Sequence, residues 1–197
     1  VGNTGISASY NSTTGTLTLT KSGGGTAAEF QEVLRTVTFS NNSDAPDPTA
    51  RRLVVSTGSV IPYIASSDSM VRYYEYVSAP GISWYDALQA AEQRSYEGLT
   101  GYLAAIHSQS ETDFIKAKVD SDAWIGGTDD YNVINEAVGY TLYTSQGQSE
   151  GKWTWVAGPE TGEIFSVGNS SPVTQEGMYA NWNGGEPNNS GSEHVLQ

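Results

Sequence analysis

Aromatic residues and charge divide the sequence into two unequal parts. All five tryptophans lie after residue 60. The first 60 residues carry four basic and four acidic side chains, whereas residues 61–197 carry five basic and 18 acidic ones, which accounts for the whole net charge of −13. Such a shift is expected where two modules with separate cores meet. We therefore predict two domains, residues 1–60 and residues 61–197, with a join between Thr57 and Ser69.

The composition excludes several classes of protein. No cysteine occurs among the 197 residues, so a disulfide framework, a thiol nucleophile and a cysteine zinc site are ruled out. The sequence pI near 4.3 disfavours nucleic acids and anionic membranes as partners and favours divalent cations. Apolar segments such as Val60–Ala65 are far shorter than the roughly 20 residues of a membrane span, so membrane insertion is not expected. The chain opens without a basic and apolar leader, and we expect it to be a segment of a longer protein.

Residues 1–60 consist of strand-forming segments separated by turn-forming residues. Gly5–Tyr10 and Thr16–Thr20 are rich in β-branched and aromatic residues, with an Asn-Ser-Thr-Thr-Gly turn between them. Further strands are expected at Val33–Ser40 and Leu53–Ser56, although apolar spacing also permits a helical turn over Ala27–Leu34. A closed two-sheet sandwich usually needs about 100 residues, so we predict a partial all-β sandwich.

The segment from Ala28 to Asp44 resembles the cadherin-like, immunoglobulin-like repeats of large bacterial surface adhesins of the RTX type. In that family a final strand follows a segment like Arg51-Arg-Leu-Val-Val. The resemblance implies a split sandwich, with the second module inserted before its last strand or strands, and neighbouring repeats of the same adhesin as partners. The acidic loop Asn41–Pro48 could hold a calcium ion between repeats, but a solvated loop is the simpler interpretation.

Two amphipathic helices are predicted early in residues 61–197. Ser83 precedes apolar residues spaced for a helix that starts at Trp84, and Ser108 precedes a second helix with Glu111 at the capping-box position. Strands are expected at Tyr73–Val77, Gly101–Ile106 and Ala123–Gly126. From Gly127 onward loops are expected to dominate, and loops this long in a compact domain usually bind something.

The segment Asn181–Glu193 gathers hard oxygen donors. Its carboxylates and amides are Glu186, Asn188, Asn189, Glu193 and Asn183. Such clusters suit Ca²⁺, which takes six to eight oxygen ligands. A cis peptide bond before Pro187 would turn the Glu186 and Asn188 side chains toward one point. On local composition alone, a polar loop without a metal is an equally good interpretation.

Five motifs in order resemble the C-type lectin-like domain. They are Trp84-Tyr-Asp-Ala-Leu, Leu103-Ala-Ala-Ile-His-Ser, Trp124-Ile-Gly-Gly-Thr-Asp129, Trp153-Thr-Trp-Val-Ala-Gly158 and Asn181-Trp-Asn-Gly-Gly-Glu-Pro-Asn-Asn189. The resemblance covers about Tyr73–Gln197. It implies an α+β fold with two helices, small antiparallel sheets and a long loop region, in which Trp124, Trp153 and Trp155 pack in the core.

A Glu-Pro-Asn triplet marks the sugar-binding calcium site of that family and usually accompanies mannose, fucose, glucose or N-acetylglucosamine. The resemblance implies that Glu186, Asn188 and Glu193 ligate Ca²⁺. It also implies that Glu186 accepts a bond from one of two vicinal sugar hydroxyls and that the Asn188 amide donates to the other.

The same resemblance implies an auxiliary calcium site at Asp129, Glu150 and Asn189. An insertion at Tyr131–Gly147 separates the first two of these residues, and an extended loop is expected at Thr161–Met178. The family completes its sugar site with a Trp-Asn-Asp triplet, which we expect to lie beyond the last residue shown.

The sequence therefore predicts a calcium-dependent lectin module of a secreted adhesin on a bacterial cell surface, which binds mannose- or fucose-type glycans. An enzyme is not expected. The acidic residues lie in polar loops without the apolar surroundings that raise the pKa of a catalytic acid. His107 follows an apolar segment and is better explained as a boundary residue than as a base, and no Ser or Asp spacing around His194 suggests a triad. The alternative function is a lectin-like module that binds protein, peptide or ice instead of sugar, because the same fold supports several functions.

Overall fold

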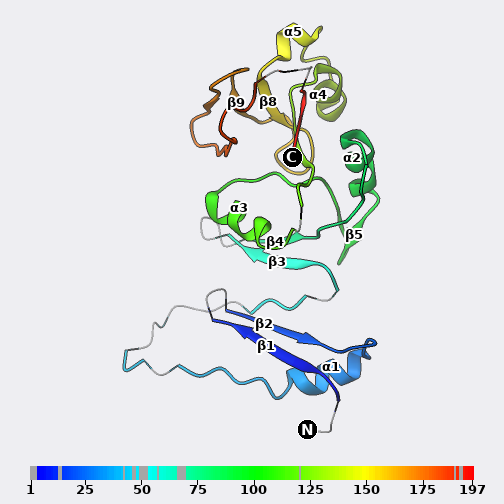
Figure 1. The fold of residues 1–197 in the computed structure, drawn as a ribbon, viewed down its shortest axis with the longest axis vertical. Helices are drawn as coiled ribbons and strands as arrows, with labels where there is room; N and C mark the ends of the chain where they lie inside the picture. Colours follow the sequence, from blue (N-terminus) through cyan, green and yellow to red (C-terminus); the bar gives the residue numbers. More distant parts are fainter. Residues whose placement is uncertain are drawn as a thin grey trace. The chain divides into compact units, whose positions relative to one another are not determined.

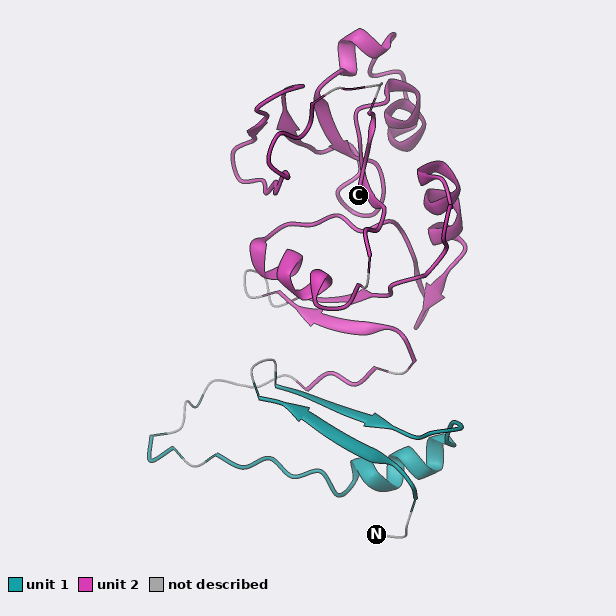
Figure 2. Ribbon diagram, viewed as in Figure 1, with its two compact units in different colours: residues 1–52 teal, residues 53–197 magenta. Residues whose placement is uncertain are grey.

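The computed structural model describes residues 4–12, 15–41, 43–45, 48, 53–56, 58–65, 70–119, 121–188, 190 and 193–197. The chain divides into two compact units, unit 1 at residues 1–52 and unit 2 at residues 53–197 (Figure 2). The division thus lies a little before the predicted one after residue 60. None of the helices described is long or apolar enough to cross a lipid bilayer.

The described part of unit 1 is one hairpin and one helix (Figure 1). Strand β1 (Ser7–Asn11) pairs antiparallel with β2 (Thr16–Thr20), in the two regions where strands were predicted. Helix α1 (Ala27–Leu34) begins at a capping box, in which the Thr26 hydroxyl accepts from the Glu29 amide and the Glu29 carboxylate accepts from the Thr26 amide. The predicted helical turn is therefore confirmed.

Two strand predictions in this region are wrong. The segment 33–40 is not a strand, because its first two residues complete α1 and the chain turns at the next two. Residues 53–56 are described and form no strand either. The all-β character predicted for residues 1–60 is thus corrected for the part that the structure describes, and the split sandwich stays a prediction.

Unit 2 is built on a five-stranded antiparallel sheet of order β10-β9-β8-β7-β11 (Figure 1). Its strands are β7 (Ile125–Thr128), β8 (Lys152–Trp155), β9 (Ile164–Val167), β10 (Val173–Thr174) and β11 (Val195–Leu196). Two hairpins accompany it, one of β3 (Ile61–Ile64) with β4 (Val71–Tyr74) and one of β5 (Ser95–Tyr96) with β6 (Leu99–Thr100). Its helices are α2 (Trp84–Glu92), α3 (Gln109–Lys116), α4 (Tyr131–Val138) and α5 (Gln146–Ser149). Helices with small antiparallel sheets confirm the α+β class.

Helices α2 and α3 confirm the two predicted helices. The Ser83 hydroxyl accepts from the Asp86 amide, and the Ser108 hydroxyl accepts from the Glu111 amide, so both caps form as expected. Helices α4 and α5 instead occupy a region predicted to be loop. The Asp130 carboxylate caps α4, and Gly139 ends it in the left-handed conformation.

The predicted strands of unit 2 are displaced or absent. Strand β7 lies two residues after its predicted position, and β4 starts two residues and ends three residues before its predicted position. The segment 101–106 forms no strand, and the 161–178 segment that was expected to be loop contains β9 and β10. In segments this short, the pattern of small and apolar residues does not distinguish a strand from a loop, so the prediction fails there.

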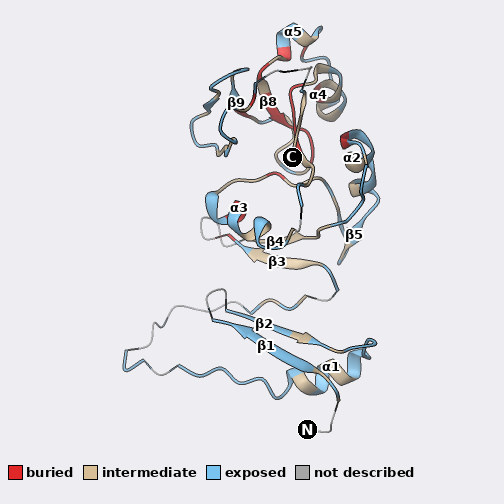
Figure 3. Ribbon diagram, viewed as in Figure 1, coloured by how far each residue is buried: buried red, intermediate tan, exposed pale blue. Residues whose placement is uncertain are grey.

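Buried side chains gather on the large sheet and the helices beside it (Figure 3). One core cluster contains Trp84 and Ile134, and the other contains Trp153, Trp155 and Phe165. The rings of Trp155 and Phe165 stack with centroids 4.2 Å apart. The predicted core positions of Trp153 and Trp155 are confirmed, because each is only 3% exposed. Such aromatic side chains supply much of the apolar area that a domain buries.

A buried carboxylate joins three segments of unit 2. Glu111 on α3 is 1% exposed. Its carboxylate accepts from the Tyr74 hydroxyl at 2.5 Å and from the His107 backbone amide at 2.6 Å, and it lies 3.2 Å from His107 Nδ1. The other ring nitrogen of His107 lies 3.2 Å from a carboxylate oxygen of Glu160, and Arg72 Nε lies 3.8 Å from Glu111. The network therefore ties β4, α3 and the loop after β8 together.

These contacts shift the pKa values of both members of the His107–Glu111 pair. The hydrogen bond to Glu111 raises the pKa of His107 above its usual 6.5, against the opposing effect of burial. Burial alone would raise the pKa of Glu111, but hydrogen bonds from His107 and Tyr74 outweigh it and hold that pKa below 4.5. Both groups are therefore charged together in mildly acidic solution.

We expect unit 2 to be most stable in mildly acidic solution. The raised pKa of His107 gives stability that is complete below about pH 6.5 and is lost as the pH rises through the folded-state pKa. The lowered pKa of Glu111 gives stability that is present above about pH 4.5 and is lost as the pH falls through its folded-state pKa. Thermal unfolding followed by tryptophan fluorescence, which reports unit 2, should show a Tm about 2–4 °C higher at about pH 5.5 than at pH 8. The variant His107→Gln should reduce this difference, and an unchanged profile in that variant would contradict the assignment.

Candidate functional site

Three side chains of metal-ligating type meet at one end of the large sheet. Asp129 directly follows β7, Glu150 directly follows α5, and His194 directly precedes β11. One candidate ligand atom from each lies within 4.8 Å of the other two. Because β7 pairs with both β8 and β11, the sheet brings together three segments that are far apart in the sequence. We call this group the Asp-Glu-His cluster.

Asp129 is the buried member of the Asp-Glu-His cluster, with 1% of its area exposed. One carboxylate oxygen lies 2.8 Å from His194 Nδ1, and the other accepts from the Gly151 amide at 2.7 Å. Burial raises the pKa of Asp129, the two hydrogen bonds oppose this rise, and the negative charge of Glu150 adds to it. A bound cation would remove this electrostatic cost, because it stabilises the charged form of both carboxylates.

Glycine is required at position 151 beside the cluster. Its φ angle is +70°, and an added Cβ would lie 1.9 Å from the side-chain oxygen of Asn169. A larger residue would therefore strain the left-handed backbone beside the amide that holds Asp129, and it would force the Asn169 side chain to move.

Polar neighbours hold the three side chains in place. The Gln146 amide donates to Glu150 at 3.1 Å and to the backbone carbonyl of Asp129 at 3.0 Å, and the Ser149 hydroxyl donates to the same carbonyl at 2.6 Å. The Thr128 hydroxyl and the Asp129 amide both donate to the His194 carbonyl. This second layer of hydrogen bonds positions the cluster in the way that outer partners position metal ligands.

The donor set of the cluster fits one class of metal better than another. Calcium takes oxygen ligands, whereas an imidazole with carboxylates suits zinc and related transition metals. The structure brings Asp129 and Glu150 together, as the auxiliary-site prediction requires, while Asn189 lies outside the described residues. Sequence reasoning missed His194 as a ligand, although it directly follows the predicted ligand Glu193. The cluster therefore fits Zn²⁺ better than the Ca²⁺ predicted for it.

The Glu-Pro-Asn loop forms a second polar site. The Glu186–Pro187 peptide bond is cis, which confirms that prediction. The Asn188 side-chain amide donates to a carboxylate oxygen of Glu186 at 2.8 Å, and the Asn188 side-chain oxygen accepts from the Ser190 amide. Within the described residues no hydrogen bond or ion pair joins Glu193 to either side chain. The structure thus brings Glu186 and Asn188 together, and the place of Glu193 in this site stays a prediction.

The segment that leads into this loop is anchored on the large sheet. The Trp182 indole donates to the Ser166 hydroxyl at 3.1 Å, and its ring meets the Trp153 ring edge-on at a centroid distance of 5.0 Å. This anchor is an aromatic contact that the polar composition of the loop does not reveal. The start of the loop is therefore held by contacts of Trp182 with the sheet.

One known protein matches the chain over both units. Halomucin from Haloquadratum walsbyi (strain DSM 16790 / HBSQ001) is 38% identical over 195 residues, which cover 94% of this chain and 2% of halomucin. The chain therefore spans a small fraction of the length of this relative. No family model matches the chain. No solved structure matches it either.

We expect the Asp-Glu-His cluster to bind Zn²⁺ about tenfold more tightly than Ca²⁺ or better, because it includes a nitrogen donor. The variant Glu150→Gln removes one charged ligand and should weaken Zn²⁺ binding by a similar factor. His194→Asp replaces nitrogen by oxygen and should shift the preference toward Ca²⁺.

Titration calorimetry with each ion would measure these affinities. Glu176→Gln is a matched control, because it removes an exposed carboxylate away from the cluster and should leave both affinities unchanged. Equal Zn²⁺ binding by Glu150→Gln and the unaltered chain would exclude the cluster as the site.

Proposed function

We propose that unit 2 is a C-type lectin-like domain that binds sugar through Ca²⁺ at its Glu-Pro-Asn loop. The order of its elements supports this proposal. The first of the five motifs begins α2, the second leads into α3, the third contains β7, the fourth overlaps all but the first residue of β8, and the fifth precedes β11. Two helices and a small antiparallel sheet with long connections are what the resemblance implies, and α4 is an addition to that plan.

The observation that carries the proposal is the pairing of Glu186 with Asn188. A carboxylate that accepts and an amide that donates lie 2.8 Å apart on one loop. Two neighbouring hydroxyls of a sugar ring need this combination, because one hydroxyl can donate to Glu186 while the other accepts from Asn188. Calcium bound there would supply a Lewis acid that coordinates the hydroxyl oxygens, and Glu186, Asn188 and Glu193 would hold it.

The proposed ligands are mannose- or fucose-type sugars of cell-surface glycans. A site with so few polar groups should bind a monosaccharide weakly, at about millimolar Kd or −4 kcal/mol. Useful adhesion then depends on many copies of the module acting together. Such copies are expected if unit 1 belongs to a cadherin-like repeat with neighbouring repeats in a larger adhesin.

The likeness to halomucin supports a secreted or surface-associated location. The acidic composition, with a net charge of −13, is consistent with a module that works where divalent cations are plentiful. Both points concern the setting of the module, and neither bears on which sugar it binds.

We expect Glu186→Gln to abolish sugar binding and weaken Ca²⁺ binding, because it removes a charged ligand and the hydroxyl acceptor. Asn188→Asp should keep or strengthen Ca²⁺ binding, because it adds negative charge, but it replaces the donor by an acceptor and should lower sugar affinity about tenfold. Calorimetry with Ca²⁺ and then with methyl mannoside would separate the two effects.

Glu150→Gln is the matched control for this test, since it removes a carboxylate from the Asp-Glu-His cluster and not from the loop. It should leave mannoside binding unchanged. A glycan array with and without chelator extends the test. Binding that survives chelation, or elution by galactose as effective as elution by mannose, would contradict the proposal.

A further inference from the structure

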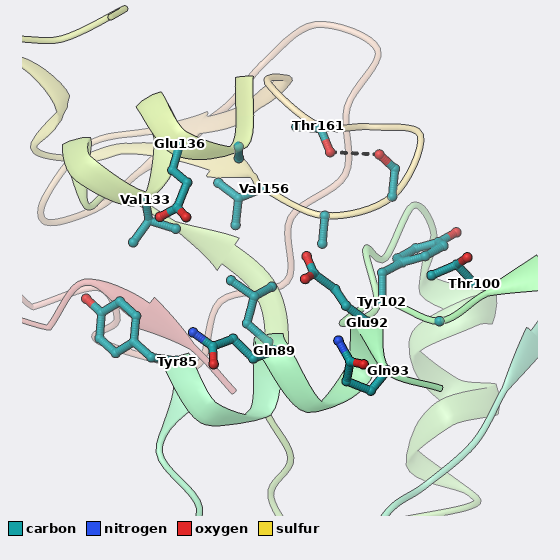
Figure 4. Close-up of a pocket in the computed structure, with 15 residues that line it drawn as sticks. Tyr85, Gln89, Glu92, Gln93, Thr100, Tyr102, Val133, Glu136, Val156 and Thr161 are labelled. Atoms are coloured by element: carbon teal, nitrogen blue, oxygen red, sulfur yellow. Dashed lines mark hydrogen bonds between the residues drawn. The ribbon is translucent and has the colours of Figure 1, made fainter. Parts of the chain in front are cut away.

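A cleft lies in unit 2 between α2, α4 and the loop that follows β8 (Figure 4). Its volume is about 720 Å³, within the range of about 300–1,000 Å³ that is typical of small-molecule sites. Neither the Glu-Pro-Asn loop nor the Asp-Glu-His cluster contributes a residue to its lining. The cleft is therefore separate from the sites described above.

The cleft combines an apolar surface with two carboxylates. Leu88, Val133 and Val156 supply apolar lining, and Val156 is buried with 6% of its area exposed. Glu92 reaches in from α2 and Glu136 reaches in from α4, with both carboxylates directed into the cleft (Figure 4). The lining contains no Lys, Arg or His. Within the described ranges, the side chains of Glu92 and Glu136 make no hydrogen bond or ion pair, so their charges are not neutralised locally.

Specific contacts hold the walls of the cleft. The Tyr85 hydroxyl on α2 donates at 2.9 Å to Asp130, the residue that caps α4, and this bond ties the two helices together. Burial raises the pKa of Tyr85 to about 12, so the hydroxyl stays protonated and remains a donor.

At the other end of the cleft, the Tyr102 ring packs against Gly158. A Cβ on Gly158 would lie 2.4 Å from that ring. Only glycine therefore allows the ring to approach the loop after β8 so closely. Contacts within the protein therefore hold both ends of the cleft.

We infer that this cleft binds a small organic ammonium ion, a positively charged amine carried on an apolar body. The apolar body would cover Leu88, Val133 and Val156, and the ammonium group would lie between Glu92 and Glu136. Both acidic residues are exposed, so the attraction is that of a surface site, and it is favourable because no cationic side chain lines the cleft to compete for them.

Two other ligand classes suit the cleft less well. A bare metal ion needs several ligands, and among the described residues Glu92 and Glu136 belong to no group of three His, Asp or Glu side chains of metal-binding spacing. A neutral sugar would leave both carboxylates without a counter-charge. The combination of apolar lining and paired acids favours the ammonium ion.

The test compares 2-phenylethylammonium with its neutral counterpart 2-phenylethanol, using calorimetry on the full chain. The ammonium ion should bind about tenfold more tightly than the alcohol or better, and its affinity should fall as NaCl is raised, because salt screens the attraction. Glu92→Gln and Glu136→Gln should each weaken binding by about three- to tenfold, and the double variant should lose the preference over the alcohol. Glu176→Gln, the control of equal charge outside the cleft, should leave the affinity unchanged.

Methyl NMR spectra would locate the bound ion. Signals of Leu88, Val133 and Val156 should shift on titration, whereas those of Val173 on β10, which is outside the lining and outside the core cluster in which these three residues pack, should not. Equal affinity for the alcohol, absence of ammonium binding, or shifts confined to other parts of the chain would each overturn the inference. Chelation should leave ammonium binding intact while it removes the proposed sugar binding, so each proposal can fail without the other.

Discussion

Antiparallel pairing of β7 with both β8 and β11 is the interaction on which the rest of unit 2 depends. It places Trp153 and Trp155 in one core cluster and brings Ile125 and Leu196 against them. The same pairing carries Asp129, Glu150 and His194 to one end of the sheet. A change that shifts the register of β7 would therefore disturb the core and the Asp-Glu-His cluster together.

The carboxylates of unit 2 fall into two groups, which differ in how far they are buried. The buried carboxylates of Glu111 and Asp129 each accept from a backbone amide and lie against a histidine, so hydrogen bonds offset part of the cost of their burial. Glu92 and Glu136 lie in an open cleft and Glu186 in a surface loop, where water or a bound cation can neutralise them. Glu111 stabilises the fold, Asp129 is anchored in the fold and also belongs to the Asp-Glu-His cluster, and the carboxylates of the cleft and the loop are available for binding.

The two proposed binding sites draw on different parts of the fold. The Glu-Pro-Asn loop is anchored by Trp182 on the large sheet, in a region that the resemblance already describes. The cleft depends on α4, which belongs to the segment that the resemblance treats as an insertion. The Tyr85 hydroxyl donates to Asp130, which caps α4. The inserted helix is therefore attached to α2 and forms one wall of the cleft.

The sequence by itself determined the elements whose signals are local. The Ser83 and Ser108 caps and the strands of the β1–β2 hairpin were predicted, and a helical turn at α1 and a cis peptide at Glu186–Pro187 were considered, because each depends on residues within a few positions of one another. Only the tertiary structure decided the rest. His194 joins Asp129 and Glu150 through the pairing of β11 with β7, and Glu92 and Glu136 come to line one cleft although they lie on different helices. These contacts join residues about 40 or more positions apart, and no local preference encodes them, because they arise from the burial of apolar surface shared by distant segments.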